Sequence, residues 1–431
     1  YRYRGAAAWD QGRTDCEGVV MGSWLLPPGD LTPDQARVVE MKPDQNRVVF
    51  GVAGSGKTQV LVHRAGYLAR SYHVTPERYR VFVFTNVIKE YIKSGIQFLG
   101  LPDETVSTFD HWCRLAYERE VSKKLPWKGK TIDFDQIRRS VLDRLKTRPA
   151  LQKSLDFVLV DEGQDLSPQA FEIISLAARH VTVFADRMQQ IFEEGAGEEQ
   201  ILARIGLRKE HATLLGAYRN SPYVAQLAYY FIADETRKKQ YLSQLGMPQM
   251  TKERPLCFVA TDHDNEMDRL AEVIRQRQLL NERVGIIVPM NRQVHGFAAA
   301  MQERGINIER AVAPRRPGMA ANFDFGNNLP KIATYHSAKG LTFDSVLMPK
   351  ITASAFDNIS DSGLRQRMLF VGIARATQWV YLSTIKGQEL EEFSLLKDAA
   401  VKNHLTIQDG KASPLRSRAT PQDDDDYDAP F

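Results

Sequence analysis

Two short stretches of the sequence carry the residue types that handle phosphate groups. The first, Gly51-Val52-Ala53-Gly54-Ser55-Gly56-Lys57-Thr58, fits the pattern G-x-x-x-x-G-K-[ST]. Its glycines allow successive backbone N–H groups to point at phosphate oxygens, and the helix that should follow adds its positive end. We expect Lys57 to reach the β- and γ-phosphates and the Thr58 hydroxyl to bind Mg²⁺. The alternative, a glycine-rich turn without a ligand, has far less support because an apolar strand precedes the loop. The residues expected to cradle the nucleotide are Gly51, Ala53, Gly54, Ser55, Gly56, Lys57 and Thr58.

The second stretch places two adjacent carboxylates directly after an apolar run. Phe157-Val158-Leu159-Val160 is followed by Asp161 and Glu162. In open α/β sheets, ligands bind outside the carboxyl ends of the strands. Asp161 is therefore expected to hold Mg²⁺, and Glu162 to polarise the water that attacks the γ-phosphate. A solvated acidic loop is the alternative interpretation, and the phosphate loop about 100 residues upstream argues against it.

The elements that must position these residues are apolar strands alternating with helical segments. Continuous apolar strands of this kind predict parallel sheets that are covered on both faces. Thr32, Pro33 and Gln35 predict a helix start with a capping box, and residues 58–69 have a helical pattern. We predict an α/β protein with two domains that change over near residue 215. The expected strands are 47–50, 81–84, 157–160, 181–184, 256–259, 285–288, 345–348 and 379–382.

Composition narrows the class of protein. The 431 residues are 43% hydrophobic and 26% charged, which is typical of a globular protein. The formal net charge of +4 is compatible with binding to nucleic acid, but it is equally typical of an ordinary solvated surface. No run of about eighteen apolar residues and no signal peptide are visible, so no membrane partner is expected. Three scattered cysteines, Cys16, Cys113 and Cys257, exclude a disulfide scaffold and fit a reducing compartment.

The motifs together resemble the superfamily 1 helicases of the UvrD/Rep type, from about Gln35 to about Thr384. The resemblance implies that Gln35 reads the adenine edge, while the capping-box role of the same side chain is equally adequate. It also implies contacts to single-stranded DNA, although a buried phenylalanine is the commoner explanation for two of the rings. The implied DNA-binding residues are Phe84, Thr85, Asn86, Thr108, Phe109, Phe192 and His336.

The same resemblance assigns the remaining nucleotide contacts. Gln189 would sense the γ-phosphate, Tyr218 would stack on adenine, and Arg219 and Arg375 would neutralise the transferring phosphoryl group, Arg375 as an arginine finger. Gly340 would let the backbone approach the nucleotide. The expected catalytic set is thus Lys57, Glu162, Gln189, Arg219 and Arg375.

Two departures from the family pattern are visible. Glu193, Glu194 and Gly195 stand where the family has an aromatic residue and an arginine, and two acids there would repel phosphates. Thr342 stands where a glutamate usually binds the ribose, so the selectivity for the sugar is expected to differ.

The implied architecture is α/β, with two RecA-like P-loop NTPase domains and a small helical insertion. We expect a first ATP-binding domain at 31–215, containing a reduced accessory insertion at about 87–155, and a second domain at 216–410. Residues 1–30 are interpreted as an N-terminal segment left by a missing upstream region, because the chain begins at Tyr1. Residues 411–431 are expected to form an acidic disordered tail. The family's large second accessory domain is expected to be absent, since few residues separate the segment at 292–304 from Thr334.

The resulting functional hypothesis is an ATP- and Mg²⁺-dependent translocase or helicase on single-stranded or partly duplex DNA, moving 3′→5′, in the cytoplasm, and serving repair or antiviral defence. The alternative is an ATP-dependent DNA-sensing subunit that gates a partner nuclease and unwinds little by itself. An ATP-binding scaffold without catalysis is disfavoured, because every residue type needed for phosphoryl transfer is present.

Overall fold

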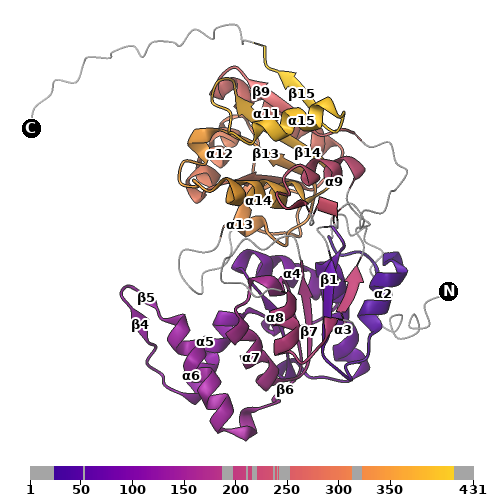
Figure 1. The fold of residues 1–431 in the computed structure, drawn as a ribbon, viewed down its shortest axis with the longest axis vertical. Coiled ribbons are helices and arrows are strands. Elements are labelled where there is room, and N and C mark those ends of the chain that lie inside the picture. Colours follow the sequence, from indigo (N-terminus) through magenta and orange to yellow (C-terminus); the bar gives the residue numbers. More distant parts are fainter. Residues whose placement is uncertain are drawn as a thin grey trace, which may run out of the picture.

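The computed structural model describes residues 24–51, 54–186, 198–209, 212–215, 221–235, 238–239, 241, 253–312 and 323–411. Within these ranges the chain forms two parallel sheets, one above the other in Figure 1, each flanked by helices. The α/β architecture with two RecA-like domains predicted from the sequence is confirmed. All eight expected strands are present, and Phe84 lies just beyond the end of its strand.

The first sheet has six strands in the order β3-β2-β6-β7-β1-β8, and every pair is parallel. The strands are β1 (Arg47–Gly51), β2 (Tyr79–Val83), β3 (Val106–Thr108), β6 (Leu155–Val160), β7 (Ala178–Ala185) and β8 (Ala212–Leu215). The helices of this part are α2 (Pro33–Glu40), α3 (Lys57–Ser71), α4 (Asn86–Phe98), α5 (Phe109–Glu120), α6 (Phe134–Thr147), α7 (Pro168–Ala177) and α8 (Glu198–Arg204).

Side-chain alternation along the strands assigns the helices to the two faces of the first sheet. Val49 packs with the residues of α3 and α4, whereas its neighbours Val48 and Phe50 pack with those of α5 to α8. Successive residues of a strand point to opposite faces, so both faces bury apolar side chains and the strands read as continuous apolar runs.

The second sheet has seven strands in the order β11-β12-β10-β13-β14-β9-β15, again all parallel. They are β9 (Leu256–Ala260), β10 (Val284–Val288), β11 (Glu309–Arg310), β12 (Lys331–Thr334), β13 (Phe343–Met348), β14 (Ala376–Ile385) and β15 (Thr406–Asp409). One face packs against α11 (His263–Leu279) and α12 (Asn291–Glu303). The other face packs against α9 (Pro222–Tyr229), α14 (Ser362–Ile373) and α15 (Phe393–Val401).

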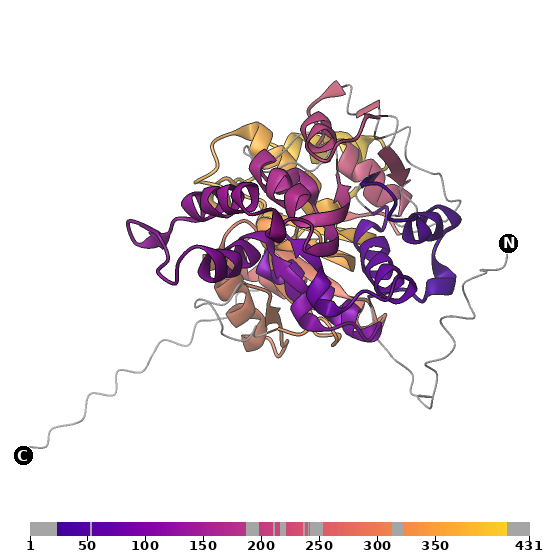
Figure 2. The ribbon, with the colours of Figure 1, turned by 90° about the horizontal axis from the view of Figure 1, so that it is seen from below.

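A helical arm projects from the first domain. It consists of α5, α6 and the two-stranded hairpin β4 (Trp127–Lys128) with β5 (Thr131–Ile132). In Figures 1 and 2 the arm points away from the side that carries α2 and α3. Arg138 of α6 bonds Asp110 at the start of α5 over 2.7 Å, so the hairpin lies at the same end of the arm as β3. This arm occupies the region where a reduced insertion was expected, and the expected domain limits stay predictions.

The two sheets are joined by packing between α4 of the first domain and the second domain. The ring of Tyr91 in α4 meets that of Phe325 edge-on, with centroids 5.1 Å apart. α4 also contacts the short helix α13 (Tyr335–Ala338). Among the described residues, no helix is both long and apolar enough to cross a membrane.

Candidate active site

The phosphate loop is a tight turn from β1 into α3. Gly54 and Gly56 have φ angles of 77° and 79°, a left-handed conformation that residues with a side chain rarely adopt. Gly56 is the N-cap of α3, which has no side-chain cap, so its first backbone N–H groups stay available to an anion. A side chain at position 51 would collide with Ser55, since a Cβ there would lie 2.3 Å from the Ser55 Oγ. The expected contact at Ala53 lies outside the described residues.

The side chain of Gln35 makes hydrogen bonds at both of its ends. Its Oε1 accepts from the backbone N–H of Thr32 over 3.0 Å, and Thr32 caps α2 in return, so the predicted capping box is confirmed. Its Nε2 donates to the carbonyl of Ser55 over 2.9 Å, and the side chain is buried. The amide therefore ties α2 to the phosphate loop, and reading of adenine stays a prediction.

Lys57 lies at the centre of a buried polar cluster. Its Nζ donates to the carbonyl of Gly51 over 2.8 Å and pairs with Asp186 Oδ2 at 3.1 Å. Asp186 directly follows β7, the strand between β6 and β1. These bonds fold the lysine back over the loop, in the direction from which phosphate oxygens would approach.

Asp161 and Thr58 form a pair suited to Mg²⁺. The Thr58 hydroxyl donates to Asp161 Oδ2 over 3.3 Å, and the other carboxylate oxygen, Oδ1, is buried without a hydrogen-bond partner. Burial, together with the neighbouring charge of Glu162, raises the pKa of Asp161 to about 7. A buried oxygen without a partner beside a hydroxyl is the donor set that a hard cation completes with water and phosphate oxygens. The residues present therefore fit the metal.

Glu162 is held ionised next to this pair. Burial acts to raise its pKa, but the positive charges of Lys339, Lys57 and Arg375 outweigh burial and hold the pKa below its usual value. Gln164 Nε2 donates to its Oε2 over 2.5 Å, which fixes the carboxylate. The φ of Glu162, 48°, is unusual for a residue with a side chain and indicates that the surrounding structure imposes this conformation.

Arg375, Gly340 and Lys339 of the second domain lie at the same place. Arg375 is buried, its Nε donates to the carbonyl of Val371 over 3.1 Å, and its charge interacts with Glu162, Asp186 and Asp161. Gly340 has a φ of 81°, and a Cβ there would lie 3.0 Å from Ile88 of α4. Lys339 Nζ pairs with Asp165 at 2.7 Å, with both side chains buried. This ion pair spans the two domains.

A cavity of about 40 Å³ lies between the domains at this site. Its walls come from the phosphate loop and α3, from Glu162, from Tyr91 and Trp24, and from Gly340, Thr342 and Arg375 of the second domain. The rings of Trp24 and Tyr91 stack with centroids 4.0 Å apart. Ligand pockets usually hold a few hundred Å³, so entry of a nucleotide requires the two domains to move apart or these rings to withdraw.

The segments expected to touch DNA lie at the carboxyl ends of β2, β3 and β12. Asn86 and His336 are exposed, and Phe84 is half-buried. Thr85 and Thr108 are the N-caps of α4 and α5, where they accept from backbone N–H groups, so each already has a structural role. All five residues keep part of their surface exposed, on segments that belong to both domains.

Phe109 differs from the other members of the set. Only 3% of its surface is exposed, and its ring meets Phe82 edge-on at 5.6 Å. This placement favours the alternative interpretation, a core aromatic residue that positions Thr108 rather than a ring that stacks on a base. The expected roles of Gln189, Phe192, Tyr218 and Arg219 fall on residues outside those described, as do the departures at Glu193, Glu194 and Gly195.

Sequence reasoning assigned no role to several residues of this site. Asp186 and Gln164 were visible only as parts of longer motifs, and the indole of Trp24 had no pattern to mark it. The pairing of Lys339 with Asp165 joins residues 174 positions apart, which no local signal can reveal. Gln164 holds two parts of the site together. Besides its bond to Glu162, its Oε1 accepts from the backbone N–H of Asp186 over 2.9 Å, which links the ends of β6 and β7.

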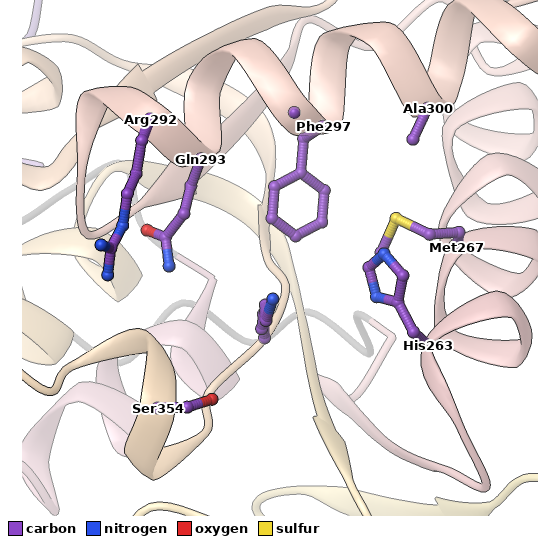
Figure 3. Close-up of a pocket in the computed structure, with 9 residues that line it drawn as sticks. His263, Met267, Arg292, Gln293, Phe297, Ala300 and Ser354 are labelled. Carbon is purple, nitrogen blue, oxygen red and sulfur yellow. The ribbon is translucent and has the colours of Figure 1, made fainter.

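A second and larger cavity, of about 470 Å³, lies in the second domain away from this site (Figure 3). It is bounded by the first turns of α11 and α12 and by the loop after β13. Its polar lining includes His263, Arg292 and Lys350, and its apolar wall includes Met267 and Phe297. None of these residues was singled out from the sequence.

Comparison with known proteins identifies two family domains in the chain. The UvrD/REP helicase N-terminal domain matches residues 31–131 and 116–204, and the UvrD-like helicase C-terminal domain matches residues 332–383. The chain is 21% identical over 282 residues to a probable DNA helicase of Mycoplasma pneumoniae, covering 60% of this chain and 50% of that protein.

Two ATP-dependent DNA helicases named PcrA are also similar. The one from Staphylococcus aureus is 26% identical over 244 residues, which cover 53% of this chain and 33% of that protein. The one from Bacillus subtilis is 32% identical over 96 residues, which cover 22% and 13%. The matched part of the chain thus spans at most half the length of these relatives.

Proposed function

Since this chain belongs to the UvrD/Rep-like superfamily 1 helicases, we propose that it is an ATP-driven motor on single-stranded DNA that moves 3′→5′. The observation that carries the proposal is the meeting of Lys57, Thr58 and Glu162 with Arg375 and Gly340 of the second domain around one cavity. A site divided between two domains couples their separation to the state of the nucleotide, which a motor needs.

In the proposed ATP hydrolysis, the charged residues of the site have separate roles. Thr58 and Asp161 would hold Mg²⁺, which would neutralise charge on the phosphates. Ionised Glu162, fixed by Gln164, would orient the attacking water, and a carboxylate with a low pKa is suited to that task. Lys57 and Arg375 would stabilise the charge on the transferring phosphoryl group from opposite domains.

A basic hairpin supports nucleic acid as the partner. Trp127, in the β4–β5 hairpin of the arm, has 63% of its surface exposed. The four lysines around it, Lys123, Lys124, Lys128 and Lys130, are exposed, and none has an ion pair within the part of the chain that the structure describes. Lysines bind the phosphate backbone and exposed aromatic rings stack on bases.

The test is ATP hydrolysis with and without single-stranded DNA, with single-stranded RNA alongside. Lys57→Ala and Glu162→Gln should abolish turnover, since losing such groups typically costs a factor of about 10³ or more. Lys146→Ala and Glu172→Gln are matched controls, because these residues form a surface ion pair at 2.7 Å far from the cavity. Turnover that ignores nucleic acid would contradict the motor. Displacement of streptavidin from only the 5′ end of a strand would support the direction.

The alternative, a DNA-sensing subunit that gates a nuclease, is favoured by one observation. Only residues 304–330 separate α12 from β12, so the described second domain carries no large accessory insertion at this point. Comparing unwinding by the chain alone with unwinding in the presence of a co-purified partner decides between the two. The expected location in the cytoplasm and the choice between repair and defence stay predictions.

A further inference from the structure

The cavity in Figure 3 lies where the first domain holds its nucleotide site. Across the second sheet, β12, β10, β13, β14, β9 and β15 take the places that β3, β2, β6, β7, β1 and β8 take in the first. α11 links β9 to β10 as α3 links β1 to β2. The helices that follow the matched strands β6 and β13, α7 and α14, each lie on the face of their sheet opposite to α3 and α11. The cavity is lined by residues that follow β9, β10 and β13, the counterparts of β1, β2 and β6.

One backbone feature repeats at this place. Glu162 is the second residue after β6 and has a φ of 48°, and Lys350 is the second residue after β13 and has a φ of 57°. Residues with side chains seldom take this conformation, so its recurrence at matched positions shows that the two loops turn alike. Where the first domain presents a carboxylate that can orient water, the second presents an ammonium that can hold an anion.

The side chains around the cavity provide an apolar wall and a cationic end. In Figure 3, Phe297 and Arg292 point inward from α12, while His263 and Met267 approach from α11. Arg292 shares its charge with Asp357 at 3.3 Å, and His263 lies 3.9 Å from the buried Glu266. Lys350 has no ion pair within the described ranges, so its charge is available to a ligand.

The lining of the cavity favours a small anion with a flat apolar part. The turn from β9 to α11 consists of Thr261 and Asp262, and the Asp262 side chain already accepts from the first turn of α11 over 2.9 Å. No glycine loop therefore surrounds a chain of phosphates here, unlike in the first domain. A volume of about 470 Å³ is in the range of small-molecule sites, and ligands of α/β sheets bind outside the carboxyl ends of the strands.

We propose that this cavity binds a nucleotide with a single phosphate, its base against Phe297 and Met267 and its phosphate at Lys350 and Arg292. The nucleotide is either free or part of a DNA strand, since both present the same chemistry. No hydrolysis is expected there, because the lysine stands where the first domain has its water-orienting glutamate. The inference does not depend on the motor function proposed above.

The test uses the full chain with the Lys57→Ala change, so that the first site does not bind nucleotide. Adenosine monophosphate and a pentamer of deoxyadenylate are titrated separately by calorimetry. Gly296→Leu adds an apolar side chain at a position that lines the cavity, where a Cβ has no atom within 4 Å. Lys350→Asn removes the charge and keeps a residue that tolerates a positive φ. Gln302→Leu, at an exposed position of the same helix, is the matched control.

We expect saturable binding of the monophosphate, weakened at least tenfold by both cavity changes and not by Gln302→Leu. Binding of the pentamer alone, with the same tenfold losses, would assign the site to a strand. Absence of saturable binding of either probe, or affinities that both cavity variants leave unchanged, would overturn the proposal. DNA-stimulated ATP hydrolysis by Gly296→Leu and Lys350→Asn chains with Lys57 intact reports separately on the motor.

Discussion

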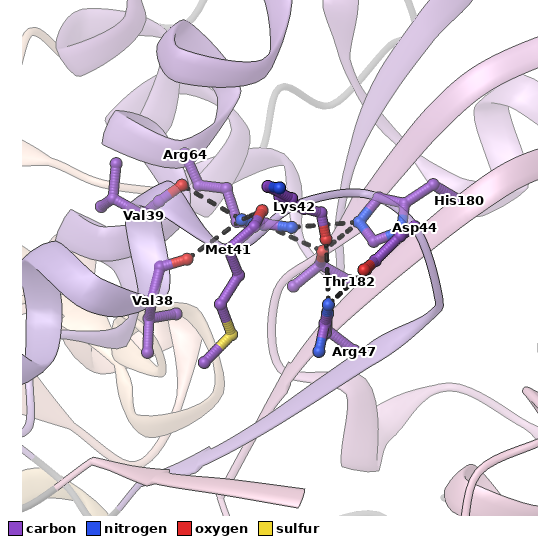
Figure 4. A network of polar contacts seen from close by, with 9 residues as sticks. All are labelled: Val38, Val39, Met41, Lys42, Asp44, Arg47, Arg64, His180 and Thr182. Carbon is purple, nitrogen blue, oxygen red and sulfur yellow. Dashed lines mark hydrogen bonds and ion pairs between the residues drawn. The ribbon is translucent and has the colours of Figure 1, made fainter. Parts of the chain in front are cut away.

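Replacing Arg64 with methionine should strongly destabilise the first domain. Arg64 is fully buried in α3, and among the described residues no carboxylate pairs with it (Figure 4). Its Nη1 donates to three backbone carbonyls at the end of α2, those of Val38, Val39 and Met41, over 2.8 to 3.1 Å. Its Nε and Nη2 bond Thr182 and His180 of β7 over 3.0 and 3.1 Å. One guanidinium thus joins the helix that carries Gln35, the helix of the phosphate loop and the strand that leads to Asp186.

The size of the effect follows from two opposed contributions. Five hydrogen bonds from a charged donor contribute about 1.5 kcal/mol each, or roughly 7 kcal/mol together. Burial lowers the pKa of Arg64 from 12.5 to about 10, and removing this unfavourably buried charge would return about 3 kcal/mol. The expected net loss for Arg64→Met is about 4 kcal/mol of unfolding free energy.

Urea unfolding followed by circular dichroism measures this loss, fitted with one transition per domain because multidomain chains need not unfold in one step. Arg70→Met is the matched control. Arg70 lies in the same helix, is exposed and bonds one backbone carbonyl, that of Leu99, so its replacement should cost less than about 1 kcal/mol. A loss for Arg64→Met as small as that of the control would refute the reasoning.

The same network predicts a pH dependence. Burial, helped by the charge of Arg64, lowers the pKa of His180 from 6.5 to about 3. In the fold His180 therefore stays neutral and can accept from Arg64, whereas the unfolded chain binds a proton below about pH 6.5. Stability should fall by about 1.4 kcal/mol per pH unit as the pH drops from 6.5 toward 3, and His180→Gln should remove that contribution. Equal slopes for the two chains would contradict a neutral His180.

Three further predictions concern the site and the arm. Asp161 has a pKa of about 7 and must be ionised to bind Mg²⁺, so kcat/KM at limiting Mg²⁺ should fall as the pH drops through 7. A higher Mg²⁺ concentration should shift this fall in kcat/KM to lower pH. A flat pH profile from pH 6 to 8 would count against the metal role. Lys339→Met should lower the free energy of unfolding by about 3 to 5 kcal/mol, because it leaves the buried Asp165 without this ion pair. In a double-mutant cycle, adding Asp165→Asn should recover part of this loss. Losses that simply add would exclude a coupling between the two residues. Replacing Lys128 and Lys130 with alanine should lower the salt dependence of DNA binding by about one phosphate contact each; an unchanged slope would place DNA elsewhere.

Much of the fold was predictable because the signals were local. The capping box at Thr32 and Gln35 needs only four consecutive residues, and the apolar run before Asp161 shows at once that a buried strand ends there. The glycines at positions 54 and 56 likewise show a turn that other residues could not form. Each of these expectations depends on neighbours in the chain, and sequence displays neighbours directly.

What escaped prediction depends on contacts between distant segments. Phe109 belongs to a segment whose resemblance to the family suggested a DNA contact, but the neighbouring rings of Phe82 and Trp112 pack against its ring. Trp24 closes the nucleotide cavity only because Gly95 of α4 leaves room for its ring, where a Cβ would lie 2.5 Å from it. Such placements depend on how helices pack, and no pattern within a single segment encodes them.

The position of β1 in its sheet has a consequence for synthesis on the ribosome. β1 carries the phosphate loop, yet its neighbours are β7 and β8, which begin 127 or more residues after it ends. At about 5 to 20 residues per second, roughly 6 to 25 s pass before a partner strand emerges. Until then an apolar strand and a glycine loop have no sheet to join. A nascent chain released before residue 215 would therefore lack an edge of the sheet that shapes its nucleotide site and would expose a strand prone to aggregation.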